Sequence, residues 1–101
     1  MDISKIEGFD WDEGNSGKNE KHGVTAAEAE QIFFDRLALT FIDEKHSQNE
    51  ERFHTLGKTK DGKLLHVTFT LRGKGAKIRV ISARPMNRRE RGIYEKPETH
   101  S

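Results

Sequence analysis

The chain has 101 residues, of which 32% are hydrophobic and 35% charged, and it contains no cysteine. This length fits a single domain with one modest core, which we expect at residues 1–96, with residues 97–101 as a tail. The lack of cysteine excludes disulfides, thiolate nucleophiles and cysteine-ligated zinc. No segment has the apolar length of a signal peptide or a membrane span, so we expect a cytoplasmic protein without membrane contact.

The net charge of +1 conceals an uneven distribution along the chain. Residues 1–51 contain 5 Lys and Arg against 13 Asp and Glu, whereas residues 52–101 contain 13 against 4. The two halves therefore carry net charges of −8 and +9. A basic half on a nearly neutral protein favours a positive face that attracts a polyanion, while the acidic half would meet a basic partner or keep the protein soluble.

The first third of the chain predicts a short strand followed by two helices. The strand is expected at residues 6–11, and a polar helix follows at residues 13–21. Thr25 and Glu28 have the spacing of a capping box, in which each side chain bonds the other residue's backbone. They predict the start of the second helix, which we expect over residues 26–35.

Four consecutive strands and a last helix follow. Alternation of apolar and polar residues predicts strands at residues 37–43, 52–58, 64–71 and 77–83, with a polar loop at 44–51. Asn87 and Glu90 form another capping box, at the start of a helix that reaches Tyr94. Because the connections between strands are short, we expect an α+β domain with an antiparallel sheet of four to five strands, two N-terminal helices and one C-terminal helix. The helices would cover one face of the sheet and leave the other open to a ligand.

The last predicted strand and the helix after it share a dense group of arginines. The group consists of Arg79, Arg84, Arg88, Arg89 and Arg91. Guanidinium groups are planar, permanently charged and fork-shaped, so this corner is suited to hold phosphate. The plain alternative is a solvated basic helix face, which applies best to the three arginines of the helix. Arg79 and Arg84 interrupt an apolar strand and its exit, which favours a functional role for that pair.

The polar loop before the second of these strands gathers groups that could cleave RNA. It contains a potential acid or base in His46, a carboxylate in Glu50 and a cation in Arg52. Metal-free cleavage needs a base for the 2′-OH, cations for the charge on the phosphate and an acid for the departing 5′-oxygen. The alternative is a solvated loop in which Glu50 or Glu51 pairs with Arg52. No histidines have the spacing of a zinc site, so we expect no metal ligands.

Five motifs occur in order along the chain. They are Lys21-His22-Gly23-Val24, the run from His46-Ser47 to Glu50-Glu51-Arg52-Phe53, Gly57 before a hairpin, Arg79-Val80-Ile81-Ser82-Ala83-Arg84, and Arg89-Glu90-Arg91 with Tyr94. Together they resemble the BrnT family, toxins of type II toxin–antitoxin systems. The similarity extends from Phe9 to Glu95. Pro85 and Asn87 depart from the pattern, but Asn caps a helix about as well as Thr and Pro is tolerated near a helix start.

The resemblance implies a ribonuclease with a RelE-like fold that cleaves RNA without a metal or other cofactor and so arrests translation and growth. It also implies a cognate BrnA-like antitoxin that binds DNA, so that the toxin would contact DNA only through its antitoxin. Together with the arginine group, it indicates these catalytic residues: His46, Glu50, Arg52, Arg79, Arg84 and Glu90. The residues expected to bind RNA or phosphate are Lys21, His22, Ser82, Arg88, Arg89 and Arg91.

Two questions stay open at this point. The spacing of the residues does not decide which group acts as general acid and which as general base. A non-catalytic module that binds RNA or a protein partner, including a degenerate toxin retained as a co-repressor, is the alternative from a different functional class.

Overall fold

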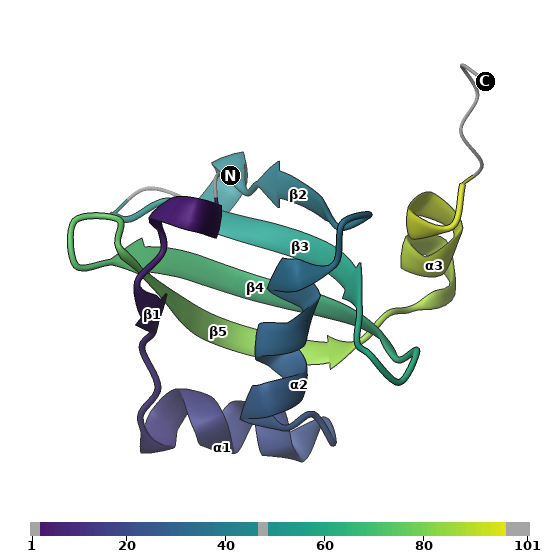
Figure 1. Cartoon of the computed structure of the whole chain (residues 1–101), viewed down its shortest axis with the longest axis horizontal. Coiled ribbons are helices and arrows are strands. Elements are labelled where there is room, and N and C mark those ends of the chain that lie inside the picture. The colour runs from purple at the N-terminus through teal and green to yellow at the C-terminus, as the bar shows by residue number, and fades with distance from the viewer. Residues whose placement is uncertain (1–2, 47–48, 97–101) are drawn as a thin grey trace.

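The computed structural model describes residues 3–46 and 49–96, so the expected tail at residues 97–101 lies outside the described part. The fold is a five-stranded sheet accompanied by three helices (Figure 1). The strands are β1 (Gly8–Phe9), β2 (Leu39–Ile42), β3 (Arg52–Lys58), β4 (Leu64–Arg72) and β5 (Lys77–Pro85), and they lie in the order β1-β5-β4-β3-β2. Strands β2 to β5 form the predicted antiparallel meander.

The expectation of a wholly antiparallel sheet is wrong, because β1 pairs with β5 in the parallel sense. Short hairpin connections impose antiparallel pairing, but β1 and β5 are separated by most of the chain, so no such connection sets their direction. Residues 6–11 were expected as one strand, and only Gly8 and Phe9 belong to it. Phe9 packs against Phe33, with ring centroids 5.6 Å apart, which anchors this short strand to the core.

The helices are α1 (Glu13–Lys21), α2 (Ala26–Gln31) and α3 (Arg88–Tyr94). The structure contains both predicted capping boxes, at Thr25 with Glu28 and at Asn87 with Glu90. The helix expected over residues 26–35 becomes a 3-10 turn, η2 (Ile32–Phe34), after Gln31. Other 3-10 turns are η1 (Ile3–Lys5) and η3 (Glu44–His46). No helix in the described part of the chain is long and apolar enough to cross a membrane.

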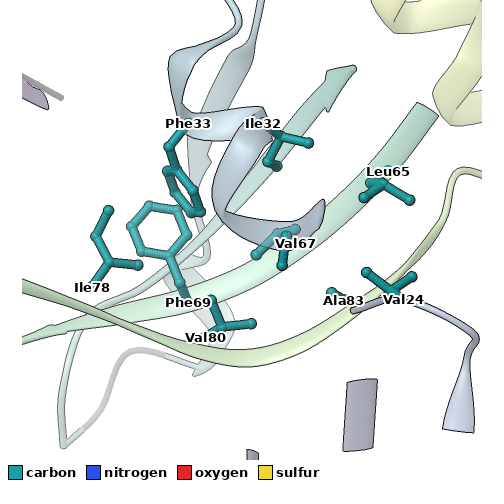
Figure 2. Close-up of a cluster of buried hydrophobic side chains, with 10 residues drawn as sticks. Val24, Ile32, Phe33, Leu65, Val67, Phe69, Ile78, Val80 and Ala83 are labelled. Atoms are coloured by element: carbon teal, nitrogen blue, oxygen red, sulfur yellow. The ribbon is translucent and has the colours of Figure 1, made fainter. Parts of the chain in front are cut away.

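The hydrophobic core lies between the sheet and the segment formed by α2 and η2. In Figure 1, α2 crosses the sheet, whereas α3 stands at the far end of β5. Figure 2 shows the rings of Phe33 and Phe69 next to one another, and their centroids are 5.0 Å apart in an edge-to-face arrangement. Val67 and Val80 are fully buried beside them. The second face of the sheet is thus left for polar side chains.

A β-bulge in β5 decides which of its residues reach that second face. Val80 pairs with Phe69 and Ser82 pairs with Thr68, so Ile81 is an extra residue without its own partner in β4. A bulge of this kind shifts the alternation of side chains by one position. Arg79 and Arg84, five positions apart, would point to opposite faces of a regular strand. With the extra residue, both lie on the face away from the core.

Candidate active site

Arg84 and Glu90 form the centre of a polar cluster where β5 leads into α3. The two terminal nitrogens of Arg84 each donate to one carboxylate oxygen of Glu90, at 2.8 Å in both cases. Glu90 also accepts a 2.9 Å bond from the backbone N–H of Asn87, as part of the α3 capping box. The carboxylate that starts the helix therefore also holds the guanidinium in a fixed direction.

His66 completes this cluster from the neighbouring strand β4. Its Nδ1 lies 2.6 Å from Nη2 of Arg84 and 2.9 Å from Oε2 of Glu90. The cross-strand register explains the contact, because His66 is the Cα partner of Arg84. Only 14% of the His66 side chain and 15% of the Glu90 side chain is exposed, so water screens these contacts weakly.

The chain of hydrogen bonds continues from His66 across the sheet. Nε2 of His66 lies 2.9 Å from Nδ1 of His54 on β3, which is also 3.0 Å from the hydroxyl of Thr68. Nε2 of His54 lies 2.8 Å from Oδ2 of Asp43, which follows β2. Asp43 is in turn 3.1 Å from Nδ1 of His46. The chain therefore links α3 and the strands from β5 to β3 with the segment after β2.

The environment of these groups shifts their protonation equilibria. Burial lowers the pKa of His66. The negative charge of Glu90 raises this pKa and the positive charge of Arg84 lowers it, and the net shift is downward. Burial works against ionisation of Glu90, but hydrogen bonds from Arg84 and the Asn87 backbone prevail and hold the pKa of Glu90 at about 2. The hydrogen bond from His54 lowers the pKa of Asp43 to about 2. At neutral pH the cluster therefore combines two carboxylates with an imidazole that favours its neutral form.

A pocket of about 290 Å³ opens beside this cluster. Its lining includes Phe41, His54, His66, Glu90 and Ile93. Phe41 and Ile93 are 47% and 41% exposed, so the charged floor of the pocket has an apolar rim. A pocket with a few convergent polar groups and perturbed pKa values is the usual setting of an active site.

The residues expected from the polar loop meet in a different hollow. His46, Glu50 and Arg52 line this hollow, which has a volume of about 380 Å³. Glu50 forms an ion pair with Arg72 on β4, with 3.3 Å between Nε and Oε2. His46 is the member that connects this hollow to the other cluster, because it shares the carboxylate of Asp43 with His54.

Arg79 lies on the same face of the sheet but is engaged by acidic residues of the N-terminal half. Its guanidinium is 2.8 Å from Oδ2 of Asp12 and 3.5 Å from Oδ2 of Asp10. The ion pairs of Lys63 with Glu28 and of Arg72 with Glu50 also join the basic half to the acidic half. These ion pairs therefore neutralise part of the charge difference between the two halves of the sequence.

The structure spreads the expected RNA-binding residues over several surfaces. Ser82 is half-buried on the polar face opposite Thr68, and Arg89 lines the pocket beside His66. Arg88 and Arg91 are exposed on α3. His22 is exposed where α1 connects to α2, and the side chain of Lys21 lies outside the described part.

Sequence reasoning missed His54, His66 and Asp43 as site residues. The alternation of β3 and β4 already placed both histidines on the polar face, and the hairpin turn at Asp61-Gly62 makes these strands neighbours. Metal-ligand spacing is a pattern along the sequence, whereas these rings meet across the sheet. Among residues 3–46 and 49–96, no group of three or more His, Asp or Glu side chains is arranged to hold a metal ion.

Comparison with known protein families now bears on this geometry. The family described as "Ribonuclease toxin, BrnT, of type II toxin-antitoxin system" matches residues 11–90. The chain belongs to this family. Its BrnT membership makes it a ribonuclease toxin and implies an antitoxin partner, and the match includes Asp43, His54, His66, Arg84 and Glu90. A comparison with individual curated proteins finds no match.

Proposed function

We propose that the chain is a metal-independent endoribonuclease of RelE-like type whose catalytic centre is the cluster of His66, Arg84 and Glu90. The observation that supports this proposal best is the position of Arg84. Its guanidinium is fixed by two bonds to an ionised carboxylate and directed at Nδ1 of a histidine that favours its neutral form. A cation for phosphate and a base for a hydroxyl are therefore adjacent, and the base lines a pocket.

The reaction is an internal transfer of the phosphoryl group. The 2′-hydroxyl loses its proton to Nδ1 of His66 while the 2′-oxygen forms a bond to phosphorus. The bond from phosphorus to the 5′-oxygen breaks, and that oxygen takes a proton from a general acid. The products are a 2′,3′-cyclic phosphate and a 5′-hydroxyl. RNA binding brings phosphate oxygens to Arg84, and the turn of Nη2 toward them frees Nδ1 of His66 to accept the proton.

The remaining residues take supporting parts. His46 is the candidate general acid, because its side chain is 59% exposed and shares the carboxylate of Asp43 with His54, which lines the pocket. Arg52 beside it supplies a second cation to the RNA backbone. Glu90 has a pKa of about 2 and stays ionised, so its part is to hold Arg84 rather than to transfer a proton. Arg79 would bind phosphate only by competing with Asp10 and Asp12 for its guanidinium.

We also propose that a BrnA-like, DNA-binding antitoxin neutralises the toxin in the cytoplasm by covering the same pocket. Phe41 and Ile93 support this proposal, because large exposed apolar side chains at the rim of a polar site suit contact with a protein. Co-expression of the adjacent antitoxin gene should restore growth and allow a complex to be purified. The substitution Phe41→Asp should weaken that complex, whereas Phe34→Asp, at an exposed aromatic residue that does not line the pocket, should not.

The decisive experiment for the catalytic proposal is cleavage of RNA by the purified chain in excess EDTA. The unaltered protein should leave 2′,3′-cyclic phosphate ends. His66→Gln should lower kcat by about 10²–10⁴-fold with little change in RNA affinity, since general base catalysis contributes that much. Arg84→Lys should also lose activity, because lysine cannot form the paired bonds to Glu90. Lys60→Gln in the exposed β3–β4 turn removes one positive charge and serves as the matched control.

Intact RNA with the purified chain, and again in a translating extract that supplies ribosomes, would refute the proposal. RNA that is bound but never cut would instead identify the non-catalytic binding module considered above.

A further inference from the structure

We infer that Asp43 is the positioning residue of the catalytic centre and acts on His66 through His54. The catalytic part of this inference is that Nδ1 of His66 accepts the proton, and this part rests on the proposed function. Its structural part concerns the resting protein and stands on hydrogen-bond geometry alone. Asp43 lies in none of the motifs that relate the chain to its family.

The donor and the acceptor of each hydrogen bond between Arg84 and Asp43 follow from these two groups, which stand at the ends of the series. A guanidinium donates only, so the 2.6 Å contact with Arg84 assigns Nδ1 of His66 as an acceptor, and its 2.9 Å contact with Glu90 becomes an ion pair only when His66 is protonated. A neutral imidazole with an accepting Nδ1 carries its proton on Nε2, and His66 therefore donates to Nδ1 of His54. By the same rule His54 carries its proton on Nε2 and donates to the carboxylate of Asp43.

The other end of the chain requires the same arrangement. An ionised carboxylate only accepts, so Asp43 requires a proton on Nε2 of His54. Nδ1 of His54 is then an acceptor, and the ring of His66 must present its N–H there. Arg84 and Asp43 thus specify one tautomer for both rings from opposite ends, and the lone pair of His66 is fixed on Nδ1, toward Arg84 and Glu90.

The charged and titratable groups around the two rings can be named element by element. His66 on β4 faces Arg84 from β5, Glu90 from α3 and His54 from β3. His54 faces Asp43 beyond β2, and the Thr68 hydroxyl adds a neutral contact. Asp43 has His46 as its second ring contact. When His66 takes up a proton, the positive charge can be shared along this chain toward Asp43, so the carboxylate favours the protonated pair.

Two measurements test this assignment. The first is ¹⁵N NMR of the histidine rings in the resting parent protein, which needs neither a variant nor activity. We expect His54 and His66 to carry their protons on Nε2. The second measures kcat, KM and the pH–rate profile of Asp43→Asn and of Glu44→Gln. Glu44→Gln is the control, because it removes the same charge from the adjacent, exposed residue of η3.

Asp43→Asn should lower kcat by at least about tenfold with KM within about twofold, because an amide neither fixes the tautomer nor stabilises the imidazolium. The rising limb of the pH–rate profile should move to lower pH, since loss of a nearby negative charge makes the base easier to deprotonate. Glu44→Gln should match the parent in all three respects. Because Asp43 also contacts His46, Asp43→Asn is repeated in the His46→Gln background, where the shift of the rising limb and the change in the His66 ring signals should persist.

The outcomes separate the two proposals. A proton on Nδ1 of His66 in the parent, or a parental profile for Asp43→Asn, would overturn the positioning role even if the parent cleaves RNA. An effect of Asp43→Asn that disappears in the His46→Gln background would overturn it as well, because the carboxylate would then act on His46. A parent that fails to cleave RNA but shows both rings protonated on Nε2 would refute the proposed function while the tautomer assignment stands.

Discussion

The hydroxyl of Tyr94 lies 2.5 Å from Oδ2 of Asp35 and donates a hydrogen bond to it. This contact joins the last residue of α3 to the residue that follows the 3-10 turn η2. Asp35 also accepts bonds from the backbone N–H groups of Leu37 and Lys58. The helix that supplies Glu90 to the candidate site is therefore attached near both of its ends, by the contact of Glu90 with Arg84 on β5 and by Tyr94.

Tyr94→Phe should reduce the free energy of unfolding by about 1–2 kcal/mol, because it removes one hydrogen bond to a carboxylate. Asp35→Asn should cost at least as much, since it weakens the contacts of two backbone groups as well. The double variant should be less destabilised than the sum of the two single variants, because both remove the same bond. Urea denaturation of the four proteins measures this coupling, and strictly additive losses would contradict the contact.

The stability of the protein should depend on acid through Glu90. Its pKa is 4.5 in an unperturbed chain and about 2 in the fold, so the folded state favours the ionised form. A carboxylate with a lowered folded pKa contributes stability above its unfolded pKa, and this contribution is lost as pH falls from about 4.5 to about 2. Glu90→Gln should flatten the acid limb of the stability curve, whereas Asp61→Asn in an exposed turn should leave it unchanged. Denaturation at several pH values in that window decides the matter.

Gly57 is required by the close packing of β3 against η2. A Cβ built at Gly57 would lie 2.8 Å from Cβ and 3.1 Å from the carbonyl oxygen of Ile32. Gly57→Ala should therefore destabilise the fold by about 1–3 kcal/mol through overpacking. Gly92→Ala on α3 is the matched control, because nothing lies within 4 Å of its Cβ position. That change should stabilise the fold by up to about 1 kcal/mol through helix propensity. Equal effects of the two substitutions in thermal or chemical unfolding would contradict the packing argument.

Phe41 offers a surface on which an RNA base can stack beside the proposed catalytic cluster. The residue is 47% exposed and lines the same pocket as His54 and His66. Phe41→Ala should raise KM for RNA by roughly 5–160-fold with kcat little changed, because stacking of a base on an aromatic ring contributes about 1–3 kcal/mol. Phe34→Ala, at an aromatic residue that is 67% exposed and contributes to another hollow, provides the control. A fall in kcat with unchanged KM would show that Phe41 acts on the chemistry instead.

The sequence predicted the meander because its signals are local. Alternation in β3 and β4, the turn between them and the two capping boxes depend only on residues close together in the chain. The parallel pairing of β1 has no local signal of that kind. It depends on contacts of Phe9 with Phe33 and of the Asp10 backbone N–H with the carbonyl of Ile78, which join distant parts of the chain.

The candidate site was only partly predictable for a related reason. Arg84 and Glu90 lie six positions apart and span the strand-to-helix corner that the arginine group indicated. The contact of His66 with Arg84 depends on the register of β4 against β5, and the bulge alters that register between the two arginines of β5. A strand read from alternation alone assigns Arg79 and Arg84 to opposite faces. The sequence therefore indicated the corner at which Arg84 and Glu90 meet and omitted His66, which contacts both, and His54, which contacts His66.

The bulge at Ile81 also limits which changes of length the gene can tolerate. Removal of Ile81 would take out the extra residue and leave a regular strand, in which Arg79 and Arg84 are four positions apart and still share the polar face. Ala83 would still face the core, and Arg84 would still lie opposite His66. An insertion of one residue between Arg79 and Arg84 would instead require a second extra residue in β5 to keep Arg84 opposite His66. We therefore expect the length of this segment to tolerate the loss of one residue better than the gain of one.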